Sequence, residues 1–202
     1  MSETKSNKQN SNPSKDRTRK IPKRITESYL HNSGLYYLER YSASSAHFKT
    51  VMLRKVRRSC MHHEDQNFDD CAPLVEKLVE KFISSGLLND DQYLQGMVSS
   101  YRKKGLSQRM IMQKLQLKGL KRDQIQGYIN KYDEQNDDEN SETKAAAIFC
   151  RRKKLGAFRL KELIEGGHEK EIAKLARAGF QYQTIKNILD MGLDDLQNLI
   201  YG

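Results

Sequence analysis

Two cysteines and two histidines, Cys60, His62, His63 and Cys71, lie within twelve residues of one another. Thiolate and imidazole are the ligands that zinc prefers, but the segment lacks the C-x2-C or H-x3-H pairs that are typical of zinc sites. The remaining cysteine, Cys150, is far away in the sequence, and three cysteines are too few for a disulfide scaffold in a chain of 202 residues. We therefore expect reduced thiols, no metal and no cofactor.

Catalytic motifs are missing from the sequence. It contains no G-x-S-x-G elbow, no phosphate-binding glycine-rich loop and no H-E-x-x-H pattern. The acidic pair Asp90 and Asp91 is better explained as first-turn charge at a helix N-terminus. We expect no catalytic residues. A metal-dependent enzyme is the least supported alternative, and it predicts stoichiometric zinc in the purified protein.

Basic residues occur in clusters. The chain has 36 Lys and Arg against 26 Asp and Glu, a net charge of +10, which favours a polyanionic or acidic partner. Like charges one helical turn apart, such as Lys114 and Lys118, destabilise a free helix by about 0.2–0.5 kcal/mol, and phosphates would offset this cost. The alternative is that each cluster is a solvated face. The candidate binding residues are Arg54, Lys55, Arg57, Arg58, Arg102, Lys103, Lys104, Arg109, Lys114, Lys118, Arg151, Arg152, Lys153 and Lys154.

The elements that position these clusters are predicted to be helices. Apolar residues recur at helical spacing over about 73–85, with Pro73 in the first turn and Gly86 at the left-handed position that ends a helix. Asn89 and Ser107 are expected to cap the next two helices, which Gly105 and Gly119 end; a further helix is predicted over about 121–132. No segment has a convincing strand pattern, so the fold is predicted to be all-α.

An internal repeat is visible at an offset of 60 residues. Lys114, Leu115, Gly119, Leu120, Ile125 and Ile129 align with Lys174, Leu175, Gly179, Phe180, Ile185 and Leu189. The shared pattern is a helix, a glycine cap and a second helix with an apolar stripe. A weaker copy begins at Lys55, with Cys60 in place of the glycine and an insertion at 62–70. We predict three tandem three-helix units.

The predicted organisation has five parts. Residues 1–28 are basic and almost without apolar residues, so we expect a disordered arm. Repeat 1 spans 29–88, repeat 2 spans 89–132, an acidic linker spans 133–143, and repeat 3 spans 144–202. The chain shows neither a secretory signal nor an apolar run long enough to cross a membrane. We expect a cytoplasmic monomer.

The central sequence resembles the RecX family of bacterial recombinase regulators. The resemblance is carried by Gly86-Leu87-Leu88-Asn89-Asp90-Asp91-Gln92-Tyr93, Tyr101-Arg102-Lys103-Lys104-Gly105-Leu106-Ser107 and Lys118-Gly119-Leu120, with weaker matches on both sides. Asn89 stands where the family often has Asp, and either residue can cap a helix. The basic arm and the 62–70 insertion are departures whose roles the resemblance does not explain.

The resemblance implies a fold and a partner. It implies an elongated, curved array of helical repeats that lies in the groove of the RecA filament on single-stranded DNA, suppresses the recombinase and so regulates DNA repair. Without the resemblance, the residues indicate a basic helical array for a polyanion or an extended polymer. The alternative is a stand-alone helical DNA-binding protein or transcriptional repressor, which predicts binding to duplex DNA without recombinase.

Overall fold

The N-terminal helices begin at side-chain caps. The computed structural model describes residues 21–135, 140–162 and 164–202. Helices α1 (Glu27–Leu38), α2 (Ser45–Cys60) and α3 (Phe68–Ser84) follow Thr26, Ser44 and Asn67, whose side chains each accept a hydrogen bond from the N–H three residues on. Helix α3 thus begins before the predicted start at Pro73, and it includes 68–70 of the predicted insertion. Its asparagine cap fixes the start, and Pro73 becomes an interior helical residue.

The central helices have the predicted caps and stops. Helices α4 (Asp90–Lys103), α5 (Gln108–Gln116) and α6 (Arg122–Gln135) follow, with Asn89 and Ser107 as side-chain caps of the first two. The glycines that follow α3, α4 and α5 all have positive φ, at 75°, 70° and 80° for Gly86, Gly105 and Gly119. These local predictions are confirmed. Cys60, in contrast, is a helical residue of α2 without positive φ, so its predicted role as a glycine substitute is wrong.

The C-terminal part contains α7 (Ser141–Lys153), the short 3-10 helix η1 (Gly156–Phe158), α8 (Gly167–Arg177), α9 (Tyr182–Asp190) and α10 (Leu193–Tyr201). Every regular element of the described ranges is a helix, which confirms the all-α prediction. No helix of those ranges combines the length and the apolar character needed to cross a bilayer. Helix α10 is additional to the three helices expected for 144–202.

Both predicted non-helical segments are shorter than expected. Helices α6 and α7 extend into the two ends of the 133–143 linker, and 136–139 lie outside the described residues.

Residues 1–20 of the predicted arm also lie outside the described residues, but 22–25 pack against the end of α2 and the loop that follows. Ile25 is 3% exposed and exchanges two hydrogen bonds of 2.9 Å with the Gln66 side chain, and the Ser59 hydroxyl donates to the Lys23 carbonyl. The arm prediction is therefore wrong for 22–28, because a buried isoleucine and side-chain hydrogen bonds order this part.

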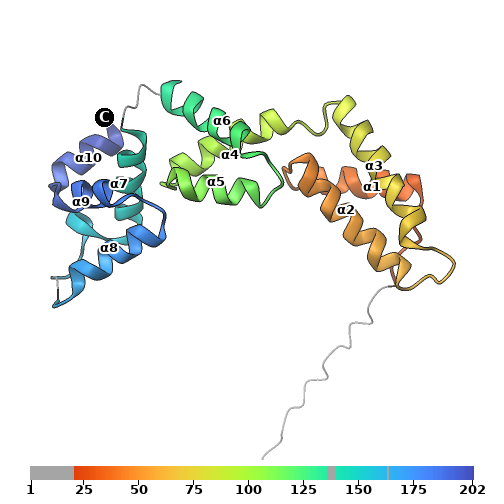
Figure 1. Cartoon of the computed structure of the whole chain (residues 1–202), viewed down its shortest axis with the longest axis horizontal. Coiled ribbons are helices and arrows are strands. Elements are labelled where there is room, and N and C mark those ends of the chain that lie inside the picture. Colours follow the sequence, from red (N-terminus) through yellow and green to blue (C-terminus); the bar gives the residue numbers. More distant parts are fainter. Residues whose placement is uncertain (1–20, 136–139, 163) are drawn as a thin grey trace, which may run out of the picture.

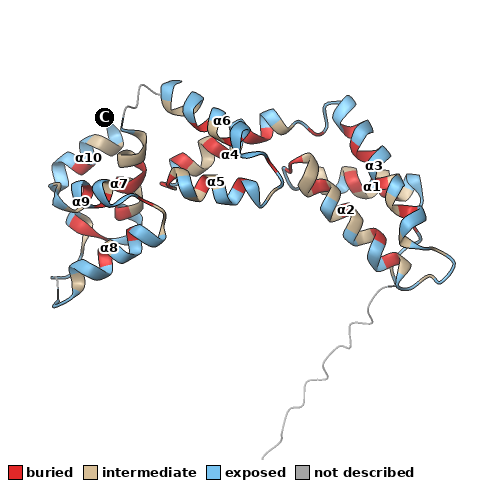
Figure 2. Cartoon of the chain, in the orientation of Figure 1, coloured by how far each residue is buried: buried red, intermediate tan, exposed pale blue. Residues whose placement is uncertain are grey.

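Among the described residues, three hydrophobic clusters form the core, one for each successive group of helices. The first lies among α1, α2 and α3, the second among α4, α5 and α6, and the third among α7 to α10. The groups follow one another along the long axis, with α2, α5 and α8 along the lower edge of the view (Figure 1). Buried residues face the inside of each group and exposed residues cover its outer faces (Figure 2). That these groups are repeats of one another stays a prediction.

The first junction joins the start of α2 to the second group. The Ser44 hydroxyl donates to the carbonyl of Lys118 at 2.5 Å, and the Asp90 carboxylate accepts from the backbone N–H and the hydroxyl of Ser45 at 2.7 and 2.6 Å. A Cβ on Gly119 would lie 2.4 Å from the Cβ of Ala46. A carboxylate and a carbonyl of the second group therefore satisfy donors at the α2 N-terminus, where backbone N–H groups lack helical partners.

The second junction uses the same types of contact. The Ser107 hydroxyl donates to the carbonyl of Ala178 at 2.6 Å, and the Glu142 carboxylate accepts from the backbone N–H of Gln108 at 3.0 Å. A Cβ on Gly179 would lie 2.6 Å from the Ser107 Oγ. In both junctions a serine cap binds the carbonyl before a left-handed glycine of the next group, and a carboxylate of the next group binds the N–H after the serine. These contacts set the positions of the basic clusters relative to one another.

Candidate polyanion interface

Most of the predicted cations lie on the surface. Arg54, Arg57, Arg58, Lys103, Lys104, Arg109, Lys114 and the run Arg151, Arg152, Lys153 and Lys154 are exposed, while Lys55 and Lys118 are half-buried. The clusters do not occupy matching places in the three groups. Those at 103–104 and 151–154 end or follow the first helix of their groups, α4 and α7, whereas 54–58 lie in α2, the second helix of its group.

Arg102 does not belong to an exposed face, and its prediction as a surface contact is wrong. Its side chain is 5% exposed, and its guanidinium binds Asp133 of α6 and Glu142 of α7, each at 2.7 Å. Burial opposes the charge, but hydrogen bonds and charges from both carboxylates outweigh it, so the pKa of Arg102 is raised. These carboxylates come from the predicted acidic linker. They neutralise Arg102 and connect the second and third groups.

The first junction brings together cations from two groups. The Lys118 Nζ lies 3.3 Å from the His47 Nε2, and Arg54 is on the same helix as His47. Burial lowers the pKa of His47, and the charges of Lys118 and Arg54 lower it further. The imidazole is therefore neutral at pH 7, and its Nε2 accepts a hydrogen bond from the Lys118 ammonium.

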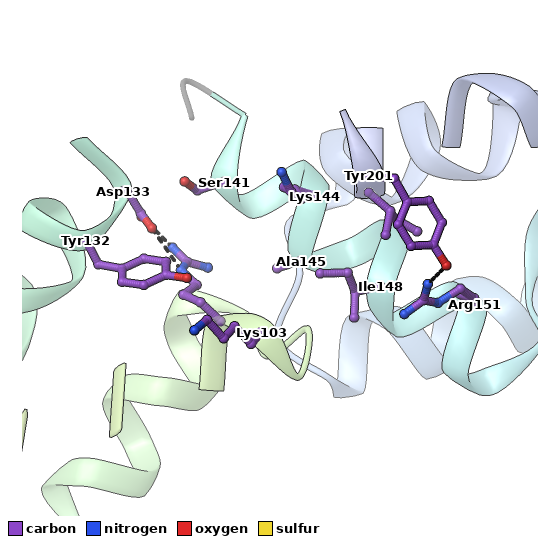
Figure 3. A pocket seen from close by; sticks show the side chains of 11 residues that line it. Lys103, Tyr132, Asp133, Ser141, Lys144, Ala145, Ile148, Arg151 and Tyr201 are labelled. Atoms are coloured by element: carbon purple, nitrogen blue, oxygen red, sulfur yellow. Dashed lines mark hydrogen bonds and ion pairs between the residues drawn. The ribbon is translucent and has the colours of Figure 1, made fainter. Parts of the chain in front are cut away.

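The second junction holds a groove of roughly 340 Å³ between α4, α6, α7 and α10. Lys103, Lys144 and Arg151 line it, with Ala145 and Ile148 contributing apolar surface. Its wall also includes Tyr132 and Tyr201, which lie toward opposite ends of the close-up in Figure 3. The Arg151 guanidinium donates a hydrogen bond to the Tyr201 hydroxyl and lies 5.2 Å from the centre of its ring. Cations around an apolar floor with aromatic rings suit a strand of nucleic acid, whose phosphates need charge and whose bases can stack.

Sequence reasoning missed four residues of these two sites: His47, Lys144, Tyr132 and Tyr201. Lys144 precedes Arg151 by seven residues, which places both on the same side of a helix, so this spacing was a usable signal. His47 reaches its site through a contact between groups, Tyr201 through its contact with Arg151 within the third group, and Tyr132 lines the groove from α6.

The Cys/His segment forms no metal site in the described residues, where no group of three or more His, Cys, Asp or Glu side chains could hold an ion. The His63 Nε2 instead forms a hydrogen bond of 2.8 Å with the Pro22 carbonyl. Burial raises the pKa of the Cys71 thiol, and the neighbouring Cys60 thiol raises it further. These side chains hold the first group together.

Similarity to known proteins identifies the family. The chain is 38% identical over 177 residues to a protein of Myxococcus xanthus described as "Regulatory protein RecX", and the alignment covers 87% of this chain and 92% of that protein. The chain belongs to the RecX family. The resemblance seen in its central sequence is thus confirmed. A second protein described as "Regulatory protein RecX", from Agrobacterium fabrum, is 26% identical over 178 residues. That alignment covers 86% of this chain and 88% of the Agrobacterium protein. No protein-family profile and no solved structure gives a significant match.

Proposed function

We propose that this RecX-family chain is a non-enzymatic cytoplasmic regulator that binds the RecA recombinase filament on single-stranded DNA and inhibits its recombinase and ATPase activities. Both relatives described above are named as regulatory proteins, which supports the regulatory role. The chain acts as a monomer in this proposal.

One observation supports the extended polymer as the target. Cations from successive helical groups lie at both junctions. Arg54 and Lys118 lie beside His47 in the first, and Lys103 and Arg151 line the groove in the second. An elongated array with positive charge at each junction can contact several successive protomers and phosphates along one filament. Inhibition then follows from steric and electrostatic interference with filament growth, ATP turnover or strand exchange.

The groove cations offer a direct test. We would measure the affinity of the full chain for recombinase filaments on poly(dT) at several salt concentrations, for the wild type and the variant Lys103→Gln, Lys144→Gln, Arg151→Gln. A control with the same change of charge replaces the exposed Lys77, Lys121 and Lys186 with Gln. If the three groove cations contact phosphates, the slope of log affinity against log salt should flatten by about 2.1, at about 0.7 for each contact.

Two outcomes would contradict the proposal. If the groove variant and the control bind filaments equally well, the groove is not part of the interface. If the wild type binds duplex DNA as tightly as filaments and does so without recombinase, the stand-alone DNA-binding alternative is correct.

A further inference from the structure

The first junction contains an unusual cluster of cation-forming side chains. His47 and Arg54 belong to α2 of the first group and Lys118 follows α5 of the second group, with 3.3 Å between Lys118 Nζ and His47 Nε2. In the described part of the chain, no carboxylate forms an ion pair with any of the three. The acidic group of the junction, Asp90, already accepts two hydrogen bonds from Ser45.

The cluster is held in place by the backbone contacts of the junction. The carbonyl of Lys118 accepts from the Ser44 hydroxyl, and the same hydroxyl accepts from the backbone N–H of His47 at 3.2 Å. One serine side chain therefore fixes the backbone of both His47 and Lys118. Such positioning reduces the entropy that these side chains would lose when they bind a ligand together.

The contact between Lys118 and His47 depends on the charge of the imidazole. An ammonium group is a donor only, so Nε2 must carry its lone pair, and a protonated imidazole would repel Lys118. An anion at this point reverses the repulsion, because a protonated imidazole and the ammonium can both donate to its oxygens. Arg54 lies seven residues after His47, on the same side of α2, and adds positive charge.

We propose that His47, Arg54 and Lys118 form a phosphate-binding site across the first junction. A tetrahedral phosphate offers several acceptor oxygens, enough for donors from both helical groups at once. The bound phosphate links the first group to the second and braces the junction. The proposal deepens the proposed function, on which it rests for the source of the phosphate, the backbone of the filament's DNA.

Histidine resonances provide the test, without recombinase. The pKa of His47 would be followed by NMR in the full chain, free and with inorganic phosphate, a twelve-nucleotide oligo(dT) or poly-glutamate. Because a neighbouring negative charge favours the protonated form, the pKa of His47 should rise from below its ordinary value when phosphate binds. The resonances of the exposed His62 and His168 serve as internal controls.

Variants test the other two donors. Lys118→Gln and Arg54→Gln should each weaken the binding of oligo(dT) that is reported by the His47 resonance, by roughly tenfold or more. The matched control is Lys77→Gln, an exposed lysine of α3 in the first group, which should leave that binding unchanged.

The outcomes separate the sources of phosphate. A rise in the His47 pKa with oligo(dT) alone supports DNA backbone as the ligand, and a rise with inorganic phosphate as well supports a site for phosphate in either form. The proposal is overturned if neither raises the pKa of His47, if poly-glutamate raises it as much, or if Lys77→Gln weakens binding as much as Lys118→Gln. Since this experiment contains no recombinase, a negative result would overturn the phosphate site without deciding whether the chain binds filaments, which the filament-binding test measures separately.

Discussion

Replacing Gly119 with alanine should open the first junction, and Gly86 offers a matched control. Both glycines end helices with similar left-handed backbones, at φ 80° for Gly119 and 75° for Gly86. A Cβ at Gly119 would lie 2.4 Å from the Cβ of Ala46, whereas a Cβ at Gly86 would meet nothing within 4 Å. Comparing the two variants separates the cost of a left-handed alanine from the cost of opening the junction.

The expected magnitudes follow from these distances. A left-handed alanine costs about 1–2 kcal/mol in the free energy of unfolding, and this applies to both variants. In Gly119→Ala the turn must also move away from α2 by about 1 Å, since ordinary contacts begin near 3.4 Å. That movement stretches the 2.5 Å bond from Ser44 to the Lys118 carbonyl beyond hydrogen-bonding length, which costs roughly 0.5–1.5 kcal/mol more.

Hydrogen exchange and denaturation are the assays. Guanidinium unfolding should show a larger loss for Gly119→Ala than for Gly86→Ala. Amide exchange should accelerate in the first turn of α2, where the N–H of Ser45 binds Asp90, only in Gly119→Ala. Equal loss of stability in the two variants, with unchanged exchange at Ser45, would refute the role assigned to the junction.

Three further outcomes are expected. Arg102→Met should lower the free energy of unfolding, measured by urea titration, by about 3 kcal/mol. This is near the lower end for a broken buried ion pair, because Asp133 and Glu142 are partly solvated. Lys103→Met should change it by less than about 0.5 kcal/mol. Burial raises the pKa of Glu171, but Arg159 and the Gly156 N–H outweigh this and lower it overall. The stabilisation that these contacts give the Glu171 carboxylate is therefore present above about pH 4.3 and is lost as pH falls through the folded pKa. Glu171→Gln should destabilise the chain at pH 7, and the loss should be smaller at pH 3. Deletion of residues 1–20 should leave the melting temperature unchanged, whereas deletion of 1–25 should lower it by removing buried Ile25.

The helix caps and helix ends were predictable from the sequence because they depend on residues that are close together in the chain. Asn89 and Ser107 cap helices through N–H groups three residues away, and Gly86, Gly105 and Gly119 end helices because they adopt positive φ without strain. The start of α3 was missed, because Pro73 and the apolar stripe gave a stronger signal than the asparagine cap six residues earlier.

Contacts between distant residues were not predictable. Arg102 looked like part of an exposed run with Lys103 and Lys104, but its partners Asp133 and Glu142 are 31 and 40 residues away. Nothing in its neighbourhood indicates burial. The same holds for His47, which becomes part of a site only because the second group places Lys118 beside it.

We propose that this RecX-family chain acts on the recombinase filament. The most direct test is the DNA-dependent ATPase of RecA on preformed filaments, with and without the full chain, at concentrations where binding to the filament is confirmed separately. The ATPase rate should be lower with the wild type, and the variant Lys103→Gln, Lys144→Gln, Arg151→Gln should lower it less. An unchanged ATPase rate on filaments that carry the bound chain would contradict the proposal.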